Sequence, residues 1–190
     1  MGIIRRKESG PTVELSVFEF IMVSSLPYDV PLIAIECTHK HGGPMFEVAE
    51  GYEEMMGRWS RQLAPLFLEF VGVQDGEKVL DVGCGTGSLA ATLARVTCAS
   101  KIIGVDPSSG LLEYARAHVK EPHVTFDVGD AQSLPYADES FDRTMALLVV
   151  NFIPDASTAA KEMRRVTKSG GIVGTAMRAV ISPMIRVPMI

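Results

Sequence analysis

Hydrophobic positions in the second half of the chain switch between two periods. Short, nearly continuous apolar runs, typical of strands buried on both faces, are separated by stretches with apolar residues at helical spacing. The expected strands are Lys78–Val82, Lys101–Asp106, His123–Val128, one within Phe141–Val150, and Gly170–Met177. The expected helices are Ser88–Val96, Ser108–Val119 and Asp155–Val166. Strands that alternate with helices predict an α/β fold with a doubly wound parallel sheet.

The chain before Lys78 follows a different pattern. Thr12–Val23 and Val30–Thr38 are strand-like runs joined by a turn, and they could pair as a hairpin. Phe46–Val71 has apolar residues at helical spacing. We therefore expect an N-terminal extension over residues 1–44, which contains the hairpin and a linker, and a main domain over residues 45–190.

A glycine-rich turn stands between the first of the regular strands and its helix. Asp81 is followed by Gly83, Gly85 and Gly87, with Cys84 inside the turn. Glycine suits such a turn because it reaches positive φ at little cost and has no Cβ to keep a ligand away. A strand, a glycine turn and a helix in this order favour a ligand held at the helix N-terminus.

Three acidic residues mark the carboxyl ends of consecutive strands, where doubly wound sheets bind ligands: Asp81, Asp106 and Asp130. Asp106 follows the glycine turn by about 20 residues, the spacing of a carboxylate that accepts hydrogen bonds from ribose hydroxyls. A dinucleotide site would need Gly-x-Gly-x-x-Gly, but Ser88 occupies the sixth position. Asp81 would also face the phosphates, so a nucleoside ligand with a positive centre fits better.

Composition narrows the class of protein further. A net charge of −5 argues against an extended nucleic-acid-binding face. The cysteines Cys37, Cys84 and Cys98 lack metal-site spacing, which predicts free thiols in a reducing cytoplasm and no metal. No apolar run approaches the ~18–20 residues that span a bilayer, and no signal peptide is recognisable. We expect a soluble, cytoplasmic protein without stable membrane insertion.

Four segments in order resemble the class I S-adenosylmethionine-dependent methyltransferases. Closest is the type 11 subgroup, related to the ubiquinone and menaquinone biosynthesis methyltransferases. The segments are Val79–Gly87, Gly104–Ser108 with the helix Leu111–Arg116, Gly129–Asp142, and Glu162–Gly171. The resemblance extends over roughly residues 46–177 and implies a Rossmann-like sheet with S-adenosylmethionine as the cofactor.

The resemblance also implies roles for the residues of the glycine turn. The backbone at Gly83, Gly85 and Gly87 would approach the methionine part of the cofactor, with Cys84 in the same turn. Asp81 would lie near the ammonium group.

Further roles are implied along the other strands. Asp106 would accept from the ribose hydroxyls, and Pro107 or Ser108 would flank the adenine. Asp130 would accept from the adenine amino group, with the N–H of Ala131 toward a ring nitrogen. Three more residues would complete the cofactor site, one near the sulfonium and two on a helix that closes over the cofactor: Leu147, Tyr52 and Trp59.

The implied reaction is in-line displacement of the activated methyl group. It requires alignment of the acceptor and exclusion of water, and no catalytic base stands out. The chain lacks the Asn-Pro-Pro-aromatic and Pro-Cys signatures of nucleic-acid methyltransferases. The favoured acceptor is therefore a small molecule that receives the methyl group on an O, N or C atom. The alternative is a truncated, catalytically weak homologue that acts as a binding or interaction module.

The family's final antiparallel strand pair is missing after Met177, so the domain is expected to be short at its C-terminus. The last strand would then be an open sheet edge, which favours homo-oligomers. Two explanations stay open. The hairpin within 12–38 could supply the missing pair, as in a circular permutation, or residues 1–44 are an extension without that role.

Overall fold

The computed structural model describes residues 21–24 and 56–176 of the chain. Within these residues one sheet has the order β1-β6-β5-β2-β3-β4. Its strands are β1 (Ile21–Ser24), β2 (Lys78–Val82), β3 (Lys101–Asp106), β4 (Val124–Val128), β5 (Phe141–Leu147) and β6 (Thr167–Ala176). The helices are α2 (Arg58–Val71), α3 (Ser88–Val96), α4 (Ser109–His118), the 3-10 helix η3 (Val150–Phe152) and α5 (Ala156–Val166).

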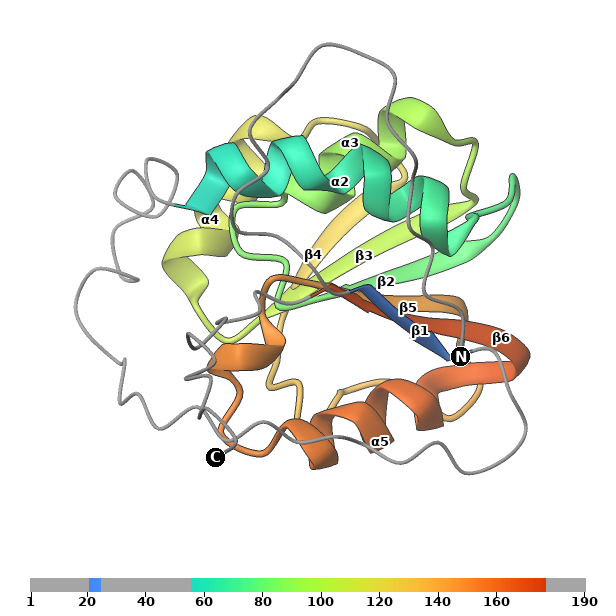
Figure 1. The fold of residues 1–190 in the computed structure, drawn as a ribbon. Coiled ribbons are helices and arrows are strands. Elements are labelled where there is room, and N and C mark those ends of the chain that lie inside the picture. The colour runs from blue at the N-terminus through green and yellow to red at the C-terminus, as the bar shows by residue number, and fades with distance from the viewer. Residues whose placement is uncertain (1–20, 25–55, 177–190) are drawn as a thin grey trace, which may run out of the picture.

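Strands β2 to β6 are parallel, which confirms the predicted doubly wound sheet. Helices α2, α3 and α4 cover one face and α5 covers the other (Figure 1). Side chains of the central strand β2 alternate between the two layers. Val79 belongs to the core under α2 and α3, and Leu80 and Val82 belong to the core over α5. This alternation turns Asp81 toward the α2 and α3 layer.

Helix ends account for the small differences from the predicted boundaries. The helix expected from Ser108 begins one residue later because the Ser108 hydroxyl accepts from Leu111 N–H at 3.4 Å as an N-cap. Asp155 is likewise the N-cap of α5, and accepts from Thr158 N–H at 3.0 Å. The last strand starts at Thr167 rather than Gly170, because its first residue pairs with Phe141 ahead of an irregularity in the ladder.

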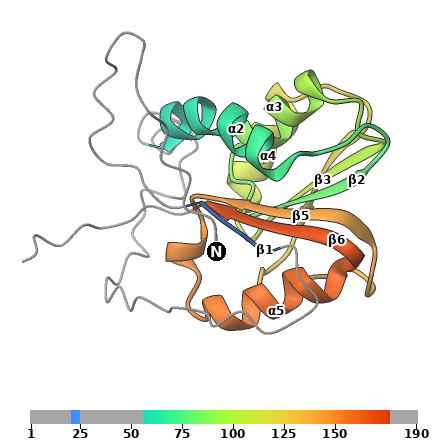
Figure 2. The ribbon, with the colours of Figure 1, turned by 45° about the vertical axis from the view of Figure 1, so that its right-hand side comes forward.

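The outer edge of β6 carries a strand from the N-terminal region. Strand β1 pairs with it in antiparallel orientation, with Ile21 opposite Ala176 and Ser24 opposite Val173. Figure 2 shows β1 lying along β6. The expected open edge is therefore wrong for residues 173–176, because distant residues of the same chain satisfy that backbone. The partner strand Val30–Thr38 of the expected hairpin lies outside the described residues.

Charged side chains at the amino ends of the strands pair with one another. Arg143 on β5 is buried, forms an ion pair with Glu77, and donates to the carbonyl of Val71 at 2.5 Å. Asp142 accepts from Lys168 Nζ at 2.7 Å and from the backbone N–H of Lys78 at 2.9 Å. These contacts tie α2, β2, β5 and β6 together at one end of the sheet.

Candidate functional site

The glycine turn after β2 has the backbone conformation that its sequence predicts. Gly83, Gly85 and Gly87 have φ of +66°, +52° and +82°, all in the left-handed region. The Gly83 and Cys84 N–H groups donate to the carbonyl of Val105 at 2.8 and 3.1 Å, which anchors the turn to β3. A Cβ on Gly83 would lie 2.3 Å from Val149 Cγ2. Glycine is therefore required at this position by both conformation and space.

Asp106 at the end of β3 supports this turn directly. Its Oδ2 accepts from Gly85 N–H at 3.0 Å, and its Oδ1 accepts from Ser108 N–H at 2.9 Å. Burial raises the pKa of Asp106, while these two N–H groups lower it. The carboxylate thus organises two segments of the site, and each oxygen keeps further acceptor capacity for the hydroxyls that the sequence assigns to it.

Asp81 at the end of β2 is a buried acid that lacks a cation as a partner among the described residues. Its side chain is 1% exposed, and Oδ2 has no hydrogen-bond partner in the described part of the chain. Burial raises its pKa to about 8; a hydrogen bond from the Ala90 backbone opposes that rise and the charge of Asp106 adds to it. A buried carboxylate without a cation is costly, and strongly shifted pKa values of this kind are frequent at functional sites.

A small cavity of about 10 Å³, the space of about one water, lies beside Asp81. Residues from four elements line it: Ser60, Asp81, Gly83, Cys84, Thr86, Ser88, Leu89 and Leu147. Four of the predicted site residues therefore lie around one cavity: Asp81, Gly83, Cys84 and Leu147. Ser60 on α2 was missed by the sequence reasoning, because no motif links a lone serine to a turn more than 20 residues away.

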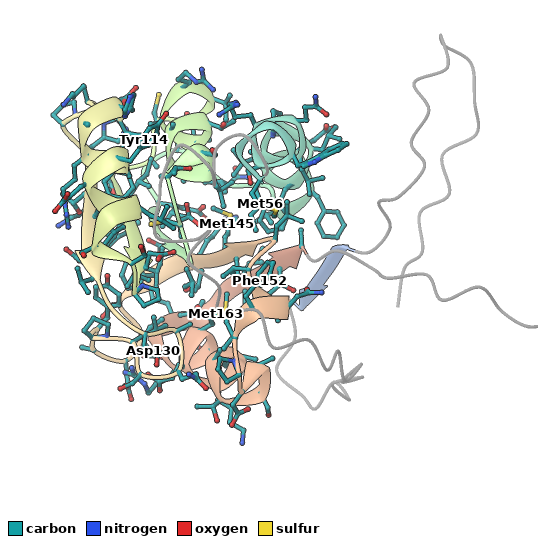
Figure 3. All side chains as sticks on the ribbon, turned by 90° about the vertical axis from the view of Figure 1, so that its left-hand side faces the viewer. Met56, Tyr114, Asp130, Met145, Phe152 and Met163 are labelled. Atoms are coloured by element: carbon teal, nitrogen blue, oxygen red, sulfur yellow. The ribbon has the colours of Figure 1, made fainter. Side chains whose placement is uncertain are left out.

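The residues expected around the nucleoside lie at the same edge but are more open. Pro107 is exposed and Ser108 is half-buried, whereas Ala131 is buried. Asp130 is exposed and accepts from the backbone N–H of Gln132 at 2.8 Å. Figure 3 faces the carboxyl ends of the strands and shows Asp130 on the side of α5, away from Tyr114 of α4.

The structure describes only part of the helix that is predicted to close over the cofactor. Trp59 is 38% exposed on α2, beside Ser60 of the cavity, and Tyr52 lies outside the described residues. Their contact with a ligand stays a prediction. At the end of β5, Leu147 is followed by Leu148 with φ of +60°, whose N–H donates to the Ala176 carbonyl at 2.7 Å. This unusual backbone fixes the chain where it leaves the sheet at the site.

Cys84 has a structural position in the turn. Burial, followed by the charges of Asp81 and Asp106, raises the pKa of its thiol well above the ordinary value. A thiol of this kind is not a nucleophile at neutral pH. Its sulfur would lie 2.8 Å from a Cβ on Gly104, so it fills the space beneath the turn.

Neither a metal site nor a membrane span is found where the chain is described. Residues 21–24 and 56–176 contain no group of three or more metal-ligating side chains. Over the same ranges, no helix combines the length and apolar character needed to cross a bilayer.

The chain belongs to the methyltransferase domain family, whose profile matches residues 80–174. The match begins in β2 and ends in β6, so it contains the glycine turn, Asp106, Asp130 and Leu147. It confirms the resemblance to the class I S-adenosylmethionine-dependent methyltransferases and the Rossmann-like fold.

Individual relatives agree with this family. The chain is 47% identical over 107 residues to methyltransferase GfsG of Streptomyces halstedii, across 54% of this chain and 38% of that protein. It is 38% identical over 144 residues to demethylmenaquinone methyltransferase of Thermotoga maritima, across 70% of this chain and 60% of that protein. The solved [4+2]-cyclase SpnF matches with a TM-score of 0.56 and 34% identity, across 60% of this chain and 43% of that one. The chain thus covers less than two thirds of the length of each.

Proposed function

We propose that this chain binds S-adenosylmethionine at the carboxyl ends of β2, β3 and β4 and transfers its methyl group to a small-molecule acceptor. The observation that carries the proposal is Asp81. A buried carboxylate oxygen without a partner, beside left-handed glycine backbone and a cavity, suits a cationic group. The donor and acceptor groups present fit this cofactor better than a pyrophosphate, which Asp81 would repel.

Each part of the site has a separate task in binding. Asp81 would pair with the ammonium group, and Asp106 would accept from the ribose hydroxyls. Asp130 and the Ala131 N–H would recognise the adenine, and Leu147 would exclude water near the sulfonium. When bound, S-adenosylmethionine supplies a methyl group that is already activated. The remaining task of the protein is to orient an acceptor and keep the site dry.

The acceptor itself is proposed to be a small molecule with a reactive O, N or C atom. The curated relatives whose names include methyltransferase support methyl transfer in general, and one of them is named for demethylmenaquinone. A cytoplasmic location and the division of the chain at residues 44 and 45 also stay proposals.

Calorimetry with three ligands tests the cofactor. S-adenosylmethionine and S-adenosylhomocysteine should bind below millimolar concentration, and NAD should not. Asp106→Ala should weaken binding by about 1.5–3 kcal/mol, because hydrogen bonds to a charged group are lost. Unchanged affinity would remove Asp106 from the ribose site, and the absence of binding by either sulfur ligand would refute the cofactor.

A second candidate is a cofactor-binding protein that does not transfer the methyl group. The similarity to a protein named as a [4+2]-cyclase favours keeping it, because that name describes a reaction other than methyl transfer. Incubation with S-adenosylmethionine and a metabolite pool separates the two. Formation of S-adenosylhomocysteine above a sample without acceptors supports the methyltransferase, and binding without turnover supports the second candidate.

A further inference from the structure

We propose that ligand binding in the cavity beside Asp81 exchanges a proton for a cation: the carboxyl group of Asp81 releases its proton as an ammonium group of the ligand takes its place. The site would then select ligands that carry an ammonium group and bind them more tightly as the pH rises. This inference rests on the proposed function, because it concerns how the same site receives its cofactor.

The first argument is the position of the carboxyl group. Asp81 lies on β2, which has β3 and β5 as neighbours on its two sides. Helix α3 begins directly after the turn, and Ser60 of α2 also lines the cavity. With 1% of its surface exposed, Asp81 cannot turn toward water. A cavity the size of one water also matches the size of an ammonium group.

The second argument is the set of charges that surround Asp81. The titratable group that raises the pKa of Asp81 is Asp106 from β3, which is not a cation. Asp81 in turn raises the pKa of the Cys84 thiol in the turn. The other elements that line the cavity contribute uncharged side chains: Ser60 from α2, Ser88 and Leu89 from α3, and Leu147 from β5.

Three cations of neighbouring strands and helices have partners elsewhere. Arg143 pairs with Glu77 at the amino end of β5, and Lys78 lies over the Phe141 ring at the amino end of β2. Arg116 of α4 donates to the Phe126 carbonyl at 2.6 Å, and its charge reaches Cys84. No cation in the described residues therefore neutralises Asp81, and burial raises its pKa to about 8, so without a ligand cation the carboxyl group keeps its proton at neutral pH.

The exchange balances in atoms and charge. One O–H bond of Asp81 breaks, its proton goes to solvent, and the carboxylate forms a charge-assisted hydrogen bond with the ammonium group. The Asp81 carboxyl group is neutral before the exchange, and the pair of carboxylate and ammonium is neutral after it, so no uncompensated charge is created at Asp81. A neutral ligand offers nothing to compensate an ionised Asp81, so the proton stays when such a ligand binds.

Calorimetry at pH 6.5 in buffers with different ionisation enthalpies counts the protons released. A free α-amino group has a pKa near 8, so the ligand is already protonated at this pH and the count reports Asp81. We expect close to one proton for S-adenosylmethionine and for S-adenosylhomocysteine. We expect none for 5′-methylthioadenosine, which shares the nucleoside but lacks the amino acid end. Affinity for the first two should rise about tenfold per pH unit between pH 5.5 and 6.5.

Two variants locate the proton. Asp81→Asn should bind without releasing one, and its affinity should not change with pH in this range. Glu69→Gln, which changes an exposed acid near the end of α2 with no role in the proposed site, should keep the release. If Asp81→Asn does not fold, the comparison of the three ligands on the natural protein decides alone.

The outcomes separate this inference from the proposed function. Binding of both sulfur ligands without proton release, or with equal release for 5′-methylthioadenosine, overturns the exchange and leaves the cofactor assignment intact. Failure of both ligands to bind at any pH overturns the cofactor assignment itself.

Discussion

The two ends of the central strands differ in whether their charged side chains have a partner of opposite charge. At the amino ends, Arg143 has Glu77 as its partner and Asp142 has Lys168. At the carboxyl ends, Asp81 and Asp106 have backbone hydrogen bonds and no cation. The pKa values follow this difference. Burial would raise the pKa of Asp142, but the hydrogen bonds from Lys168 and Lys78 lower it, whereas burial dominates at Asp81.

This contrast separates stability from binding within one sheet. Paired charges at the amino ends hold elements of the fold together. The acids at the carboxyl ends have no cation as a partner in the described part of the chain, and acids with strongly shifted pKa values are frequent at functional sites. Both ends are built by the same strands, so substitutions at each end test the contrast directly.

The largest effect is expected for Arg143→Ala. It leaves Glu77 without its partner and the Val71 carbonyl without its donor. Breaking a buried ion pair on one side lowers the free energy of unfolding by about 3–5 kcal/mol. Urea denaturation measures this, and a double-mutant cycle with Glu77→Gln isolates the pair. A loss below about 1 kcal/mol would show that the amino ends do not stabilise the fold in this way.

Gly83→Ala should have the next largest effect, at the carboxyl ends. A left-handed alanine costs about 1–2 kcal/mol, and the overlap with Val149 adds about 1–3 kcal/mol. Gly170→Ala is the matched control, because Gly170 has φ of +78° but nothing within 4 Å of an added Cβ. Denaturation should show the backbone penalty alone for Gly170→Ala. Equal losses in the two variants would contradict the close packing of the turn.

Asp81→Asn should change how stability depends on pH. The folded protein keeps this proton up to about pH 8, while the unfolded chain releases it near pH 3.8. The contribution of Asp81 to stability is therefore present below the ordinary pKa and is lost as the pH rises toward 8. The free energy of unfolding of the natural protein should therefore fall by about 2–3 kcal/mol relative to that of the variant between pH 5 and pH 7.

Asp142→Asn should change the pH dependence of stability in the opposite direction. The pKa of Asp142 is lowered in the folded protein, so its contribution is present above the ordinary value and is lost as the pH falls below it. This variant should be less stable at pH 7, and the difference should shrink in acid. Thermal unfolding across pH measures both variants, and parallel curves for the two would remove the contrast between the ends of the sheet.

The smallest effect is expected for Lys168→Ala. Lys168 pairs with Asp142 at 2.7 Å, but its side chain is 47% exposed. Exposed ion pairs contribute about 0–1 kcal/mol, and salt weakens them. Urea denaturation at low and high salt should show a loss below about 1 kcal/mol that decreases with salt. A loss as large as that of Arg143→Ala would mean that burial does not decide which pairs stabilise the sheet.

The order and type of the regular elements could be predicted from residue patterns. Continuous apolar runs indicate β2 and β3, and helical spacing indicates α3, each with the bounds that the structure has. Backbone conformations that depend only on the local sequence could also be predicted. The glycine turn is one of these, because positive φ at Gly83, Gly85 and Gly87 is a property of the local backbone.

Other features depend on contacts between distant residues. The pairing of β1 with β6 joins residues about 150 positions apart, and the sequence of β1 does not indicate which strand it pairs with. Ser60 reaches the cavity because α2 packs against α3, β5 and β6, and neither its residue type nor its neighbours signal that role.

Sequence by itself determined the parallel sheet, the glycine turn and the acids at the strand ends, since each follows from local periodicity or residue chemistry. Tertiary structure decided which acids are paired and which are isolated. Asp81 and Asp142 are the same residue type on neighbouring strands, yet one meets a cavity and the other meets a lysine. Burial and partners set the pKa of a carboxyl group, and both arise only when the chain is folded.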